Sequence, residues 1–214
     1  MDLELAKKLL SEKYLTLVDY DDKIYYDNRE DLSIPLENHY SINLINNEWA
    51  FCFIQLERRN IPDIEILKKF ENKSDAIDHL FLHVIRRYFL DKFIIPSRKS
   101  GCQINNLKSL KIKMSELFIP EHYLCDKEKS KEHSICFYKT NDGWFESFIG
   151  VKNEIIATSK KGLPDETLFF SNARLNSIYS LYLLDRYINE LLEISNVILS
   201  YSDYQIANYL GYNI

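Results

Sequence analysis

Three side chains on one stretch of the sequence have the types and spacing of a helical metal site. Asp75, His79 and His83 follow one another at four-residue steps, which places them on one face of a helix, and imidazole and carboxylate groups bind zinc. The same helix also has to place Leu80 and Val84 in the core beside them. We therefore predict that these histidines flank the core and hold no metal ion.

Histidine and cysteine recur at a second spacing, H-x-x-C, in the other half of the chain. His122 precedes Cys125 and His133 precedes Cys136 by three positions, and four such ligands would complete a zinc site. Residues 134–137, however, have the pattern of a β-strand, in which the side chains of His133 and Cys136 point to opposite faces. The sequence therefore predicts no metal and no other cofactor.

The patterns of nucleophilic and acid–base catalysis are missing from the sequence. It contains no G-x-S-x-G element and no cysteine-nucleophile signature, the patterns that place a nucleophile beside its base. Paired carboxylates occur as Asp21-Asp22, Glu30-Asp31 and Asp165-Glu166, but each pair lies at an expected turn or helix start, where acids are common. We predict that the chain is not an enzyme and has no catalytic residues.

Composition argues against several other classes of protein. Only five glycines occur among the 214 residues, all isolated, so the closely spaced glycines of phosphate-binding loops are missing. A net charge of −5 argues against direct nucleic-acid binding, which requires a basic surface, and favours a basic partner. The longest apolar stretch, residues 80–95, is interrupted by charged residues such as Arg86 and Asp91, so we predict no membrane span.

Cysteine usage and the start of the sequence predict the cellular compartment. The four cysteines show no C-x-x-C spacing, and residues 2–13 form an amphipathic pattern without the apolar core of a signal peptide. The sequence therefore predicts a cytoplasmic protein with reduced thiols. It leaves the oligomeric state open.

Two similar runs of sequence indicate a repeated unit. Residues 40–54 resemble residues 133–149, because in each run polar turn residues separate two aromatic or β-branched segments, as in a β-hairpin. In each copy a serine, Ser74 or Ser171, then precedes apolar residues at three- and four-residue steps, which predicts an N-cap and a helix. We predict an α+β fold of two similar units, each a small antiparallel sheet with a long helix packed on one face.

Further elements and boundaries follow from the same patterns. Trp49 and Trp144 are expected to anchor the core on the inner face of each sheet. A first helix, two strands and a short closing helix are expected at residues 2–13, 14–19, 23–26 and 201–210. The predicted domains are an N-terminal helix with the first strand-helix unit, a basic linker, and the second unit with a C-terminal helix, at residues 1–95, 96–111 and 112–214.

Acidic residues are concentrated in one segment of the first unit. Between Asp19 and Glu37 the sequence has seven acids and two bases, a local balance of −5, with three tyrosines interleaved. Carboxylates on a surface steer a basic partner toward it, and tyrosines supply buried anchors at interfaces. This segment is therefore the first candidate for a binding surface.

The first unit also resembles a known class of proteins. Glu48-Trp49 on a strand, Glu57-Arg58-Arg59 at a strand end, and Phe70 before Ser74-Asp75-Ala76 at a helix start resemble immunity proteins of bacterial polymorphic-toxin and contact-dependent growth-inhibition systems. The resemblance covers residues 14–93. In the second half, Lys152-Asn153-Glu154 stands where Glu57-Arg58-Arg59 would be, so the partner surface is expected in the first unit alone.

The resemblance implies a function in protein binding. Immunity proteins bind one cognate toxin domain, often a nuclease, and block its active site or its substrate-binding surface. We expect the toxin-binding residues to be Asp19, Tyr20, Asp21, Asp22, Tyr25, Tyr26, Asp27, Glu30 and Asp31. Two alternatives stay open, namely a scaffold or self-associating interaction module without a toxin partner, and a metal-dependent enzyme without a recognisable motif.

Overall fold

The computed structural model describes residues 1–27, 29, 36–56, 62–99, 103–126 and 131–212. The chain divides into two units, Met1–Ile85 and Arg86–Ile214, and the division falls inside helix α2 (Lys73–Phe89). Each unit combines helices with its own β-sheet. The predicted α+β class with two units is confirmed.

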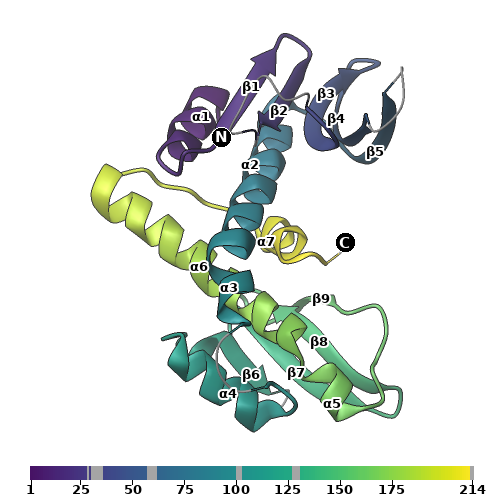
Figure 1. The fold of residues 1–214 in the computed structure, drawn as a ribbon, viewed down its shortest axis with the longest axis vertical. Coiled ribbons are helices and arrows are strands. Elements are labelled where there is room, and N and C mark those ends of the chain that lie inside the picture. The colour runs from purple at the N-terminus through teal and green to yellow at the C-terminus, as the bar shows by residue number, and fades with distance from the viewer. Residues whose placement is uncertain (28, 30–35, 57–61, 100–102, 127–130, 213–214) are drawn as a thin grey trace. The chain divides into compact units, whose positions relative to one another are not determined.

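The first unit contains a five-stranded sheet in which every pairing is antiparallel (Figure 1). Helix α1 (Leu3–Ser11) precedes the sheet and buries Ala6, Leu9 and Leu10. The strands lie side by side in chain order and are β1 (Thr16–Tyr20), β2 (Lys23–Asp27), β3 (His39–Ile45), β4 (Glu48–Gln55) and β5 (Asp63–Phe70). The last of them, β5, was not predicted from the sequence.

Turn chemistry explains why the predicted hairpins form. Asn46 and Asn47, which join β3 to β4, have φ values of 51° and 65°. Positive φ at both central residues is the signature of the type I′ turn, whose twist matches that of the strands, and asparagine tolerates it better than most residues. The predicted hairpins at β1–β2, β3–β4 and residues 134–149 are all confirmed.

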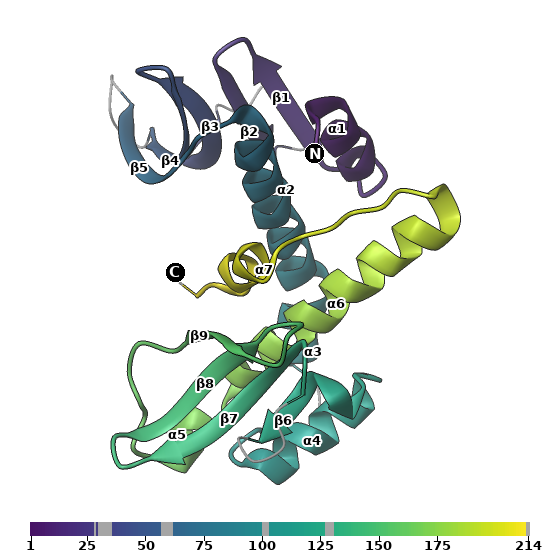
Figure 2. The same cartoon turned by 180° about the vertical axis from the view of Figure 1, so that it is seen from behind.

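Helix α2 packs on one face of the first sheet (Figures 1 and 2). The ring of Phe51 on β4 lies 4.7 Å from that of His79 and 5.2 Å from that of His83. Leu80 and Phe81 on the same helix are fully buried. The helix predicted after Ser74 is therefore present, with its apolar side against the sheet.

The cap of α2 differs from the prediction. The side chain of Asn72, not that of Ser74, accepts the backbone N–H of Asp75 at 2.9 Å, so the helix begins at Lys73, one residue before the predicted cap. The hydroxyl of Ser74 instead donates to the Met1 carbonyl oxygen at 3.1 Å. Ser171 does hold the N-cap position of α6, but its side chain makes no capping hydrogen bond.

The second unit contains a four-stranded sheet and most of the helices (Figure 2). Its strands are β6 (Leu124–Asp126), β7 (Ser134–Thr140), β8 (Gly143–Ile149) and β9 (Ile155–Thr158). Its helical segments are a π-helical turn (Leu90–Ile94), α3 (Ile95–Ser97), α4 (Leu107–Glu116), a 3-10 turn (Glu121–Tyr123), α5 (Glu166–Phe169), α6 (Asn172–Ser195) and α7 (Asp203–Leu210). β6 pairs with β7 in parallel, so the expectation of a purely antiparallel sheet is wrong for this pair.

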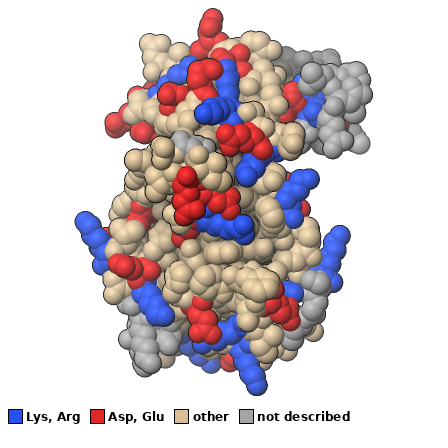
Figure 3. Space-filling model, turned by 90° about the vertical axis from the view of Figure 1, so that its left-hand side faces the viewer, with Lys and Arg blue, Asp and Glu red and all other residues tan. Residues whose placement is uncertain are grey.

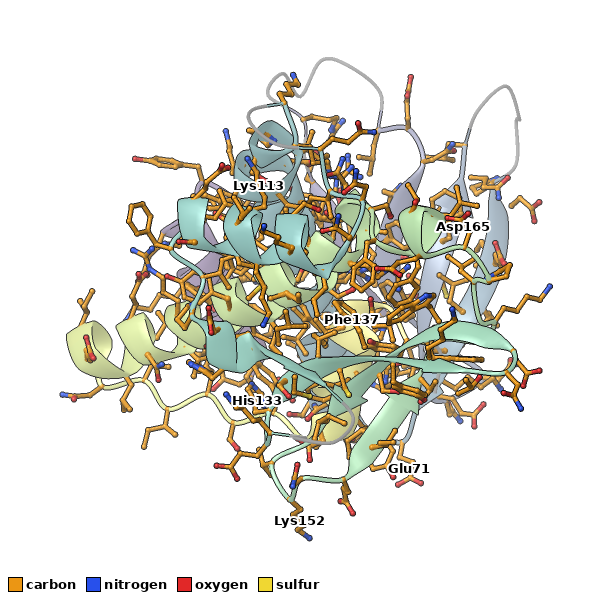
Figure 4. The ribbon with its side chains drawn as sticks, turned by 90° about the horizontal axis from the view of Figure 1, so that it is seen from below. Glu71, Lys113, His133, Phe137, Lys152 and Asp165 are labelled. Carbon is orange, nitrogen blue, oxygen red and sulfur yellow. The ribbon has the colours of Figure 1, made fainter. Side chains whose placement is uncertain are left out.

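Aromatic residues fill the space between this sheet and its helices. Phe137 on β7, labelled in Figure 4, meets Phe169 and Phe170 edge-on at 5.4 and 5.8 Å. Trp144 on β8 stacks on Phe169 at 5.6 Å but is only partly buried, so it lies at the margin of the core rather than inside it. Trp49 in the first unit is only partly buried and lies beneath the Lys73 ammonium, 5.1 Å from the ring centre.

Residues 96–111, expected to be a linker, carry regular structure at both ends. Pro96 and Ser97 belong to α3, and α4 begins at Leu107 with Asn106 and Ser109 forming a capping box. Gly101 and Cys102 lie outside the described residues. None of the helices in the described part of the chain combines the length and apolarity needed to cross a membrane.

Replacing Gly143 with alanine should destabilise the second unit by about 2 kcal/mol. Gly143 has φ +116°, and a Cβ there would lie 2.8 Å from the Leu163 backbone, which exchanges two backbone hydrogen bonds with Trp144. Urea denaturation should measure this loss, while Asn141→Ala in the adjoining turn serves as the control. Equal stability of the two variants would contradict the assignment of strain to Gly143.

Candidate functional site

The β1–β2 hairpin ends in an exposed group that we call the hairpin tip, Tyr20, Asp21 and Asp22. Tyr20 is 60% exposed, and its ring stacks on that of Tyr25, with 6.4 Å between the ring centres. The two aspartates are exposed, and no hydrogen bond or ion pair to their carboxylates is formed among the described residues. The Leu44 N–H donates to the Asp22 carbonyl oxygen at 2.8 Å, which ties the tip to β3.

Two other predicted acids are already paired within the first unit. The Asp19 carboxylate accepts a hydrogen bond from the Lys7 ammonium on α1. Arg29 donates to both oxygens of Asp27, at 2.9 and 2.6 Å, and this hydrogen-bonded guanidinium holds the pKa of Asp27 below its usual range. Neither carboxylate therefore offers an uncompensated charge to a partner.

Strand alternation divides the predicted residues between two faces. Tyr20, Tyr25 and Asp27 share one face of the sheet, whereas Asp19 and Tyr26 lie on the other. Tyr25 is only 8% exposed, and burial raises its pKa. Glu30 and Asp31 lie outside the described residues.

A row of polar side chains that the sequence reasoning missed lies on the face of Tyr20 and Tyr25. We call Lys23, His39, Ser41 and Asn43 the polar stripe. The Nδ1–H of His39 donates to the Glu37 carbonyl oxygen at 2.9 Å, which leaves Nε2 to accept from the Lys23 ammonium at 3.2 Å. Burial lowers the pKa values of both His39 and Lys23.

The stripe is unusual because its polar groups are buried. His39, Ser41 and Asn43 are 6%, 0% and 9% exposed, whereas on the opposite face Tyr40 and Leu44 are 36% and 40% exposed and only Ile42 between them is fully buried. Ser41 Oγ and Asn43 Oδ1 have no hydrogen-bond partner among the described residues. The alternation of polar and apolar residues from His39 to Leu44 is visible in the sequence and indicates a strand. It did not reveal the polar stripe, because an alternating strand is expected to bury its apolar side.

The helical histidines are placed as predicted, beside the core. His79 packs against Phe51 and Phe70, and His83 packs against Tyr40. Burial, followed by the nearby Lys68 charge, lowers the pKa of His79 to about 4. Within the described part of the chain, no three His, Cys, Asp or Glu side chains lie close enough to hold a metal ion.

His133 belongs to a polar cluster of the second unit (Figure 4). Asp185 on α6 accepts from His133 Nε2 and from the Tyr123 hydroxyl, both at 2.9 Å. Burial lowers the pKa of His133, but the hydrogen bond and charge of Asp185 outweigh it, so the pKa is raised. The hydroxyl of the neighbouring Ser134 donates to the Lys131 carbonyl oxygen and makes no hydrogen bond with the His133 imidazole. The cluster therefore joins α6 to the sheet but does not pair a serine nucleophile with a histidine base.

A cavity of about 170 Å³ lies in the second unit. Its walls include the aromatic rings of Phe137, Trp144 and Phe170. The charged members are Lys111, Glu121 and Lys131. Pockets for drug-sized ligands usually measure about 300–1,000 Å³, so this cavity is small for a nucleotide or a large cofactor.

Figure 3 shows lysine and arginine side chains interspersed with aspartate and glutamate over the face in view.

Among the residues that carried the resemblance, Glu48 binds the Lys69 ammonium at 2.6 Å, and Glu57-Arg58-Arg59 lies outside the described residues. Among the described residues of the predicted surface, the hairpin tip combines carboxylates that form no hydrogen bond or ion pair with an exposed aromatic ring. No protein-family model, curated protein or solved structure matches the chain.

Proposed function

We propose that this chain is a cytoplasmic immunity protein, which neutralises a cognate toxin domain by covering its active site or substrate-binding surface. The observation that carries the proposal is the hairpin tip. Asp21 and Asp22 are exposed without an ion pair among the described residues, whereas the neighbouring Asp19 and Asp27 are both paired. Among the described acids of the predicted toxin-binding residues, the carboxylates without an ion pair are therefore those at the turn.

The chemistry of the tip suits a basic partner. A toxin nuclease binds phosphate through lysine and arginine, and two adjacent carboxylates present comparable negative charge to such a surface. Tyr20 adds a large exposed ring that a partner can cover, and aromatic residues dominate binding energy at many interfaces. Stacking on Tyr25 and the Asp22–Leu44 backbone hydrogen bond hold these groups in place, which reduces the entropy lost on binding.

Charge reversal at the tip tests this proposal. The partner to use is the C-terminal domain of the large secreted protein that this proposal expects to be encoded directly upstream. For the Asp21→Lys/Asp22→Lys variant we expect the association rate constant, measured by surface plasmon resonance at low salt, to fall about tenfold. We also expect the salt dependence of this rate to become shallower, because the steering charges are reversed.

The control is Glu154→Lys/Glu193→Lys, which makes the same change of net charge at two exposed positions outside the tip. Circular dichroism establishes that all variants are folded. If reversal at the tip changes the rate no more than the control does, the binding surface lies elsewhere. If the upstream domain neither binds the wild-type chain nor arrests growth in its absence, the immunity function itself is refuted.

A further inference from the structure

The outermost strand of the first sheet, β5, has one edge with which no other strand of the described residues pairs. The sheet order is β1-β2-β3-β4-β5, and among the described residues β4 is the strand that pairs with β5. An edge strand carries a row of backbone N–H and C=O groups that point away from the sheet and can pair with another chain. β5 spans eight residues, which is longer than the roughly five or six residues of a typical strand.

Apolar side chains accompany this edge. Ile64, Ile66 and Leu67 are 49%, 44% and 46% exposed. Monomeric proteins usually protect edge strands by keeping them short or by placing proline and charged residues on them. On β5, these three exposed apolar side chains alternate with charged residues and accompany a bulge, and their exposed area is what a partner strand would cover.

The charges on β5 are arranged so that the strand complements itself. A bulge pairs Cys52 with Ile66 but Phe51 with Lys68, so Leu67 is the extra residue. Because of this bulge, Glu65 and Lys68 lie on the same face of the sheet, the face of Phe53 and Phe51. In an antiparallel pair of two β5 strands, with Ile66 opposite Leu67, Glu65 of each copy stands opposite Lys68 of the other.

We propose that a second copy of this chain pairs with it through β5, antiparallel and around a two-fold axis. The pairing forms one continuous sheet from the two five-stranded sheets, with two Glu65–Lys68 pairs on one face and the apolar residues packed across the junction. An isologous contact of this kind closes on itself and yields a dimer rather than a fibre. The inference goes beyond the proposed function, because β5 and the hairpin tip lie on opposite edge strands of the sheet.

Exchange of the two charges tests the pairing. Sedimentation equilibrium of the full chain, from micromolar to hundreds of micromolar, should show a monomer–dimer equilibrium for the wild type. Glu65→Lys and Lys68→Glu should each weaken dimerisation about tenfold, because each creates two like-charge pairs. An equimolar mixture of the two variants should dimerise again, and so should the double variant Glu65→Lys/Lys68→Glu, because opposite charges then face each other.

The control Glu154→Lys makes the same change of charge as Glu65→Lys, but at a position outside the edge, and should leave dimerisation unchanged. A wild-type chain that stays monomeric over this range overturns the proposal, and so does a dimer that both single variants leave intact. Binding of another protein's strand at this edge would appear as a monomeric wild type and would likewise overturn it. Because the tip residues are unchanged in these variants, failure here is separate from failure of the toxin-binding proposal.

Discussion

Replacing Arg174 with methionine should lower the free energy of unfolding of the second unit by about 3–5 kcal/mol. The Glu146 carboxylate is buried, and its Oε2 accepts from Arg174 Nη1 at 2.7 Å. The other oxygen accepts from the hydroxyls of Ser177 and Tyr212, at 2.8 and 2.7 Å. Without the guanidinium, a buried negative charge is left with two neutral donors, whereas methionine keeps the apolar contact that Arg174 makes with Phe169.

Each unit contains one tryptophan, so fluorescence in a Trp49→Phe background reports urea unfolding of the second unit. Arg186→Met is the matched control, because the Arg186–Glu190 pair lies on the same helix with side chains 61% and 40% exposed, and it should cost less than about 0.5 kcal/mol. Adding Glu146→Gln to Arg174→Met should restore more than half of the loss, since it removes the unpaired charge. A loss in Arg174→Met no larger than in Arg186→Met would refute the argument.

Acid should destabilise the first unit through His79. Its pKa is about 4 in the folded chain against 6.5 for the free side chain, so the unfolded state binds more protons between these values. The stabilisation is therefore complete above pH 6.5 and is lost as the pH falls toward 4. A difference of this size corresponds to about 3 kcal/mol at full protonation.

The measurement is urea unfolding at several pH values in a Trp144→Phe background, which leaves Trp49 as the reporter of the first unit. His79→Phe should remove this part of the pH dependence while keeping the ring contacts with Phe51 and Phe70. His122→Gln changes an exposed histidine and should leave the dependence as it is in the wild type. Parallel stability curves for His79→Phe and the wild type across this range would show that His79 is not the titrating group.

Local chemistry explains which elements the sequence revealed. Asn46-Asn47 marked a hairpin, and the period of apolar residues after Ser74 marked α2, because turns and amphipathic helices are encoded by neighbouring residues. β5 was missed because the alternation of polar and apolar residues over Asp63 to Ile66 is short and is broken by Leu67, the extra residue of the bulge. β6 has three residues, too few to show a periodic pattern, and it exists through its pairing with β7.

The candidate site was predictable only in part for the same reason. The carboxylates and tyrosines of the tip could be read from composition, but the pairing of Asp19 depends on Lys7, which another element supplies. The alternation of β3 predicts burial of the face that carries Ile42, which is indeed fully buried, whereas the burial of Ser41 and Asn43 on the other face depends on the assembled sheet. Tertiary contacts therefore decided which predicted charges remain available to a partner.

The parallel pairing of β6 with β7 sets Cys125 opposite Cys136, and both thiols are buried in one cluster with Ile149. The pairing of β6 with β7 therefore shields both sulfur atoms from solvent. When the three-residue strand separates from the sheet, both thiols lose their cover in the same event. Their rates of alkylation thus report the local opening of one sheet edge, separately from global unfolding.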